Sequence, residues 1–163
     1  MRAKRIVLFV VVAVVTLALD QLTKGWARSA LVPGVSQPVI DGYWDWDLAY
    51  NPGIAFSMFV GATGARVVLS VIATAAIVAL TATAAKTEAR LHRVALAVIA
   101  GGAAGNLVDR ARTGVVTDFV RWHLHDHTWP VFNVADVALI AGVGLLVVEG
   151  FFARRRERAR MTA

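Results

Sequence analysis

Four long apolar runs dominate the pattern of hydrophobic and polar positions along the chain. They cover residues 6–26, 67–85, 94–112 and 133–152. Each run is close to the roughly 20 apolar residues that a helix needs to cross a bilayer. The pattern predicts an all-α integral membrane protein with four transmembrane helices, and we expect residues 1–163 to form a single membrane domain.

The first run resembles a secretory signal, because a basic start at Arg2, Lys4 and Arg5 precedes an apolar core. However, no small-residue cleavage site follows this core, and Asp20 and Lys24 extend the segment. We therefore predict an uncleaved first span.

The pattern changes to a period of two between the first and second runs. In residues 44–51, large apolar side chains alternate with polar or small ones, which predicts a strand. Its aromatic face suits a sheet at the membrane interface, where Trp and Tyr concentrate. Asn51-Pro52-Gly53 then predicts a turn. We expect a small interfacial β-rich region outside the cytoplasm, although the same aromatic residues could simply be membrane anchors.

Two glycines in the third run, Gly101 and Gly105, have the four-residue spacing that lets helices approach closely. Residues 113–131 then read as a polar, aromatic connection to the fourth run.

Basic residues cluster at one set of span ends. Residues 1–5 carry three of the 17 Lys and Arg, residues 86–93 carry three, and residues 154–160 carry five. Because cytoplasmic loops are enriched in Lys and Arg, these segments are predicted to face the cytoplasm. Both termini are then cytoplasmic, and residues 31–59 and 113–131 face outward.

The amino-acid composition limits the classes of site and partner that the chain can have. The chain is 58% hydrophobic with a mean hydropathy of +0.63, whereas soluble domains are about 45 to 50% apolar. The absence of cysteine excludes disulfides, thiolate metal sites and a cysteine nucleophile. The net charge of +6 follows membrane topology, and no interleaving of basic and aromatic residues on a soluble face indicates a nucleic-acid partner.

A set of polar residues gathers near the predicted outer ends of the spans. One carboxylate or guanidinium at membrane depth costs from about 2.5 to more than 10 kcal/mol, so such residues are functional candidates by default. Helical spacing places Asn106, Asp109 and Arg110 on one face. The remaining members are Asp20, Asp118, Asn133 and Asp136.

Two pairs that include these polar residues also have purely structural interpretations. Asp20 and Lys24 are four residues apart and could form an ion pair at the membrane surface. Asn133 is a good helix N-cap, and a carboxylate at Asp136 favours the helix dipole. The capping interpretation leaves Asp118 and the 101–110 segment unexplained.

Two aspartates held close in a partly desolvated site share one proton, which makes the pair an acid and a base together. The ionised member can activate water for attack on a peptide carbonyl, and the protonated member can then supply a proton to the leaving amine.

With these polar residues, the chain resembles the lipoprotein signal peptidases, also called signal peptidase II or prolipoprotein signal peptidase. The likeness covers nearly the whole chain and rests on five motifs in order. These are Asp20-Gln21-Leu22-Thr23-Lys24, Asn51-Pro52-Gly53-Ile54-Ala55-Phe56-Ser57, Gly105-Asn106-Leu107-Val108-Asp109-Arg110, Val115-Val116-Thr117-Asp118-Phe119 and Phe132-Asn133-Val134-Ala135-Asp136.

The resemblance implies an aspartic endopeptidase of the bacterial cytoplasmic membrane. Such enzymes cut prolipoproteins just before the diacylglyceryl-modified cysteine, with the active site near the outer face. Asp118 and Asp136 match the catalytic pair. The positions that match substrate-binding or supporting residues are Asn51, Asn106, Arg110, Asn133, Asp20 and Asp109. We expect prolipoproteins and membrane lipids as partners, a monomer, and neither a cofactor nor a metal.

Two positions depart from the family pattern. Thr117 replaces a usually aliphatic residue and could add a hydrogen bond near Asp118. Ile54 replaces a common Ala and could narrow a pocket for lipid.

Three other functions compete with the peptidase. His123, His125, His127 and Asp126 could form a metal site, although no His-Glu-x-x-His arrangement is present. The embedded carboxylates could instead serve a small proton- or cation-coupled transporter, but no internal repeat is evident. A purely structural membrane protein would leave the converging polar groups without a purpose.

Overall fold

Four long helices lie side by side in the computed structural model, which describes residues 2–124 and 127–161, without the side chains of 2–4, 54–57, 59–60 and 153–161. The helices are α1 (Arg2–Ala30), α2 (Ile54–Lys86), α3 (Arg90–Thr113) and α4 (Val134–Met161). Each contains a segment long and apolar enough to cross a membrane, namely Arg5–Ala30, Gly61–Lys86, Arg90–Thr113 and Val134–Phe152. The predicted membrane fold with four helices and a small β-rich region is confirmed.

Helix α3 is the centre of the bundle and packs against all three other helices. Its glycines permit this position. A Cβ added at Gly101 would lie 2.6 Å from the carbonyl oxygen of Ala13 in α1, so only glycine allows the two backbones to approach this closely. The close contact predicted from the glycine spacing is present.

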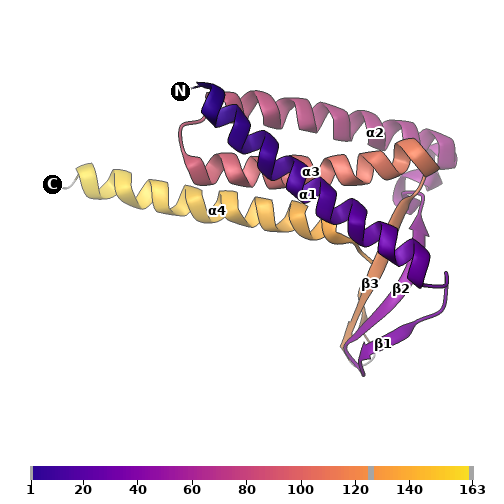
Figure 1. Cartoon of the computed structure of the whole chain (residues 1–163). Helices are drawn as coiled ribbons and strands as arrows, with labels where there is room; N and C mark the ends of the chain where they lie inside the picture. The colour runs from indigo at the N-terminus through magenta and orange to yellow at the C-terminus, as the bar shows by residue number, and fades with distance from the viewer. Residues whose placement is uncertain (1, 125–126, 162–163) are drawn as a thin grey trace.

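A four-stranded antiparallel sheet lies at the end of the bundle opposite both chain termini (Figure 1). Its strands are β1 (Gln37–Ile40), β2 (Trp44–Asn51), β3 (Val116–Leu124) and β4 (His127–Thr128), in that spatial order. The strand predicted at 44–51 is β2. The segment expected as a connection contains β3, which pairs with β2 so that Ala49 lies opposite Asp118.

An apolar cluster fixes the sheet to the end of α1. Leu48 of β2 and Phe119 of β3 are buried against Ala27 and Leu31. The Trp46 ring meets the Trp26 ring edge to face, with centroids 4.9 Å apart. This packing determines where β3, and therefore Asp118, lies relative to the helices.

The predicted turn after β2 is also present. Gly53 has φ 82°, in the left-handed region that glycine adopts without strain. Its N–H donates a 2.8 Å hydrogen bond to Oδ1 of Asn51. Helix α2 begins directly after this turn and is interrupted by non-helical backbone at Gly61.

Candidate active site

The polar residues predicted from sequence converge where the sheet meets the helix bundle. Asp118 comes from β3, whereas Asp136 lies in the first turn of α4. Helix α3 contributes Asn106 and Asp109 to the same region.

Asp118 is buried, with 3% of its surface exposed. Its Oδ1 accepts a 2.6 Å hydrogen bond from Nδ2 of Asn133, and its Oδ2 accepts one of 3.1 Å from Nδ2 of Asn51. Burial raises the pKa of Asp118 to about 6. The nearby negative charge of Asp136 also raises this pKa, while the hydrogen bonds from Asn133 and Asn51 oppose the increase.

Asp136 is partly exposed and accepts two hydrogen bonds. Nδ2 of Asn106 donates to its Oδ1 at 3.0 Å, and the Asn133 backbone N–H donates to its Oδ2 at 3.2 Å. In return, the Asp136 N–H donates to Oδ1 of Asn133 at 3.0 Å. This is a reciprocal helix cap, so the capping interpretation of Asn133 is correct. The same cap brings the Asp136 carboxylate beside the Asp118 network.

Two asparagine side chains join the carboxylates. Asn133 donates its amide both to Asp118 and, at 3.3 Å, to Oδ1 of Asn106. Asn106 in turn donates to Asp136. Asp118, Asn133, Asn106 and Asp136 therefore form a continuous hydrogen-bonded chain.

Lys24 holds an inner member of this hydrogen-bonded chain, Asn106, in place. Its side chain is fully buried, and its Nζ donates a 2.8 Å hydrogen bond to Oδ1 of Asn106. An ammonium offers only donors, so it fixes the oxygen of the Asn106 amide toward Lys24 and the nitrogen toward Asp136.

The charge of Lys24 is balanced by two carboxylates. Its Nζ lies 2.9 Å from Oδ2 of Asp20 and 3.2 Å from Oδ2 of Asp109. The Asp20–Lys24 pair predicted from its spacing therefore exists, but it lies inside the protein and not at the membrane surface. Burial of a charge is costly, and pairing of the ammonium with the two carboxylates inside the protein offsets this cost.

Asp20 joins three helices. Its Oδ1 accepts a 2.9 Å hydrogen bond from the Ala135 N–H in the first turn of α4. A Cβ at Gly105 of α3 would overlap its carboxylate. Gln21 adds a bridge, because its Nε2 donates to Oδ2 of Asp20 at 3.2 Å and to Oδ1 of Asp109 at 3.3 Å.

Asp109 anchors the strand that carries Asp118. Its Oδ2 accepts a 2.9 Å hydrogen bond from the Thr117 backbone N–H. The Thr117 hydroxyl accepts a 2.9 Å hydrogen bond from Nη1 of Arg28, which also lies 3.5 Å from Oδ1 of Asp109. The extra hydroxyl of this chain therefore acts on the position of β3, one residue before Asp118.

Arg110 of α3 adds a positive charge to the same region. Its Nη1 lies 3.4 Å from the carbonyl oxygen of Asn106, to which it donates. Its charge interacts with the carboxylates of Asp136, Asp118 and Asp109. Arg110 is partly exposed, whereas Asp118 and Asp109 are buried.

The structure thus brings together all eight residues predicted for the site, and it adds three that were not assigned to it. Lys24 and Gln21 lie within the first sequence motif, and Arg28 follows Lys24 by one helical turn on the same face. A four-residue step through Asp20, Lys24 and Arg28 is the sequence signal that could have revealed this buried face of α1.

The alternative metal site is only partly covered by the structure. Nε2 of His123 lies 3.3 Å from Oδ2 of Asp45, while His127 is exposed. Among the residues that the structure describes, no cluster of three potential metal ligands occurs. His125 and Asp126 lie outside the described residues, as does the side chain of Ile54.

Comparison with known proteins assigns the chain to a family. The family model for signal peptidase (SPase) II matches residues 12–152. The chain belongs to the signal peptidase II family. It is therefore a peptidase that crosses a bacterial membrane several times, which does not favour the transporter interpretation.

Curated members of the signal peptidase II family are similar over most of their length. The lipoprotein signal peptidase of Xanthomonas oryzae pv. oryzae is 38% identical over 155 residues, covering 93% of each chain. That of Xylella fastidiosa is 39% identical over 145 residues, covering 85% of this chain and 87% of its own.

The fold is also similar to that of a solved bacterial membrane enzyme, determined by the in meso method at 1.9 Å resolution. The TM-score is 0.78 with 28% sequence identity, covering 86% of this chain and 90% of the other. The arrangement of helices and sheet is therefore shared with an enzyme.

Proposed function

We propose that the protein is an aspartic endopeptidase that removes signal peptides from prolipoproteins, cutting on the N-terminal side of the diacylglyceryl-modified cysteine. Membership of the signal peptidase II family and the names of its relatives support the substrate. One observation carries the mechanism. Asn133 donates its side-chain amide to Asp118 and its backbone N–H to Asp136, and so holds the two carboxyl groups in one site.

The environments of the two aspartates support different roles. Asp118 is buried, and burial favours its neutral form. Asp136 lies in the first turn of α4, where the helix dipole and the Asn133 N–H favour a carboxylate. We therefore assign the shared proton to Asp118 and the role of base to Asp136.

The chemistry follows from this division of roles. Asp136 accepts a proton from water as the water oxygen attacks the scissile carbonyl carbon, while Asp118 donates a hydrogen bond to the carbonyl oxygen. The tetrahedral intermediate then collapses, the C–N bond breaks, and the departing nitrogen takes up the proton that Asp136 accepted from water. Asp136 is then a carboxylate again and Asp118 still carries its proton, so the pair is ready for the next cycle.

The other site residues support these two. Asn51 and Asn133 orient Asp118, and Asn106, held by Lys24, orients Asp136. Arg110, which is partly exposed, is assigned to contact the substrate. Asp20 and Asp109 hold the helices and β3 in register.

The orientation in the membrane is part of the proposal. The termini lie at one end of the bundle and the sheet at the other (Figure 1). Basic residues are concentrated toward the terminal end, which favours the cytoplasm for that end and places the site near the outer face of the cytoplasmic membrane. We propose a monomer whose partners are prolipoproteins and membrane lipids, with no nucleic acid.

The first test is cleavage of a purified diacylglyceryl-modified prolipoprotein in detergent. Wild type should cut before the modified cysteine, whereas Asp118→Asn and Asp136→Asn should each lose at least about a thousandfold in rate, because a required acid or base is removed. Thermal unfolding should show that both variants remain folded. A folded variant with near-normal activity would contradict the assignment of that aspartate.

The transporter alternative makes a separate prediction. Proteoliposomes containing a carboxylate-dependent transporter would show proton-coupled flux that is lost in the aspartate variants. Cleavage without such flux is the outcome expected from the proposed peptidase.

A further inference from the structure

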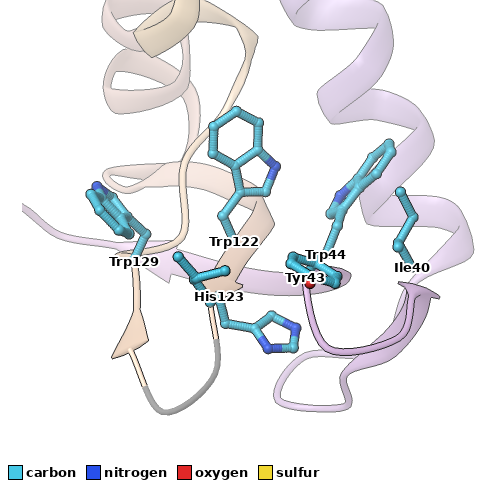
Figure 2. Close-up of a pocket in the computed structure, with 7 residues that line it drawn as sticks. Ile40, Tyr43, Trp44, Trp122, His123 and Trp129 are labelled. Carbon is cyan, nitrogen blue, oxygen red and sulfur yellow. The ribbon is translucent and has the colours of Figure 1, made fainter.

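A hollow lies at the far tip of the sheet, away from the two aspartates. Its volume is about 360 Å³, within the roughly 300–1,000 Å³ usual for small-molecule sites. Figure 2 shows its wall residues, with Trp129 and Ile40 at opposite ends and Tyr43 between them. The complete lining is Ile40, Tyr43, Trp44, Trp122, His123, Leu124 and Trp129.

Aromatic rings form most of this tip pocket. Trp122 is 56% exposed and Trp129 is 61% exposed. The Trp129 backbone N–H donates a 2.8 Å hydrogen bond to the carbonyl oxygen of Trp122, which holds the two residues side by side. Ring faces exposed around a hollow attract cations, and alkylammonium groups in particular.

Two carboxylates lie beside the tip pocket, although neither belongs to its lining. Asp45 contacts the wall residue His123, and Asp41 lies in the turn between β1 and β2. The sequence contains neither Lys nor Arg between Arg28 and Arg66. Arg121 on β3 is paired with the buried carboxylate of Asp47. An aromatic pocket with carboxylates beside it, in a chain of net charge +6, complements a cation better than an anionic group.

The position of the pocket indicates where such a cation comes from. The sheet is attached to the ends of the membrane-crossing helices, and its tip extends sideways beyond α4 (Figure 1). Lipid headgroups occupy this level of a membrane, and exposed Trp and Tyr are enriched there. Trp122 lies four residues from Asp118 along β3, roughly 13 Å at strand spacing, so the pocket is separate from the aspartates.

We propose that the tip pocket binds the alkylammonium headgroup of a zwitterionic phospholipid, of the ethanolamine or choline type, from the leaflet next to the active site. The rings contact the ammonium group, and Asp45 and Asp41 balance its charge. Binding a lipid of the surrounding bilayer at this point anchors the free end of the sheet on the membrane.

Native mass spectrometry of the full-length protein in detergent tests this binding. Wild type, given equal amounts of phosphatidylethanolamine and phosphatidylglycerol, should retain the ethanolamine lipid preferentially. Trp129→Leu, which keeps an apolar side chain but removes the ring, should weaken ethanolamine-lipid binding about three- to tenfold. Asp45→Asn should have a similar effect, and Trp129→Phe should retain most of the affinity. Binding of phosphatidylglycerol should not weaken in any of these variants.

Matched controls separate the pocket from general membrane contact and from catalysis. Phe152→Leu removes an exposed ring on α4, outside the pocket, and should leave the lipid preference unchanged. Asp118→Asn should also keep the preference, so failure of the catalytic proposal would not affect this result.

Three outcomes would overturn the proposal. The first is equal retention of both lipids by wild type. The second is an unchanged preference in both Trp129→Leu and Asp45→Asn. The third is that those variants raise only the KM for prolipoproteins with lysine near the cut, because the pocket would then bind peptide and not lipid.

Discussion

Lys24 shows how a single residue determines the geometry of the whole site. Its buried ammonium contacts Asp20, Asp109 and Asn106. Asp20 in turn binds the first turn of α4, Asp109 binds β3, and Asn106 donates to Asp136. The geometry of the candidate site therefore depends on a charge for which the structure describes no hydrogen bond to Asp118 or Asp136.

Replacing this ammonium should destabilise the fold. Lys24→Met leaves the buried Asp20 carboxylate without a paired cation and leaves Asp109 with Arg28 alone, which should lower the free energy of unfolding by about 3–5 kcal/mol. Thermal unfolding in detergent measures the change. Arg5→Met is the control, because its pair with the 82% exposed Glu88 should contribute only about 0–1 kcal/mol. Equal losses in the two variants would contradict the role of Lys24.

Asp118 should make stability depend on pH. Its pKa is raised from 3.8 to about 6 in the folded protein, so the native state binds this proton more tightly than the unfolded state does. The resulting stability is present below about pH 3.8 and is lost as the pH rises to about 6. The thermal midpoint of wild type should therefore fall relative to that of Asp118→Asn between pH 4 and 7. A constant difference across this range would show that the Asp118 pKa is not raised.

At the scale of elements, the sequence revealed the helices and β2 more readily than β3. The four helices follow from long apolar runs, and β2 has one aromatic face. In β3, polar residues occupy both faces, because Asp118 points to the site while Thr117 on the other face is fixed by Asp109 and Arg28. Its pattern was therefore not the simple alternation that predicts a half-buried strand.

The candidate site was predictable as a set of residues but not as a network. Helical spacing placed Asn106 and Asp109 on one face of α3. In the structure they serve different partners, since Asn106 reaches Asp136 while Asp109 reaches Lys24 and Thr117. Such partners depend on how α1, α3, α4 and the sheet pack, which spacing within one helix cannot reveal. The catalytic roles themselves remain predictions.

The contact between α1 and α3 gives a test at the scale of elements. Gly105→Ala would place a Cβ against the Asp20 carboxylate and should lower the free energy of unfolding by about 1–3 kcal/mol through overpacking. Gly144→Ala in α4 is a matched control, because no atom lies within 4 Å of its added Cβ. That variant should instead gain about 0.5–1 kcal/mol from reduced backbone freedom. Destabilisation by Gly144→Ala alone would contradict this account of the packing.

The orientation of the whole molecule can be tested directly, because the chain has no native cysteine. Gln37→Cys on the sheet and Ala89→Cys between α2 and α3 introduce single exposed thiols at opposite ends of the bundle. In spheroplasts, a membrane-impermeant maleimide should label Gln37→Cys at once and Ala89→Cys only after lysis. The reverse labelling would place the candidate site on the cytoplasmic side.

The division of the two aspartates between β3 and α4 also matters while the protein is being made. Asp118 emerges from the ribosome before Asp136, and the asparagine that holds both carboxyl groups begins the last helix. A chain with only three helices inserted contains neither Asn133 nor Asp136. Under the proposed aspartic mechanism, such a chain cannot cut a precursor, and activity begins only once α4 has been added.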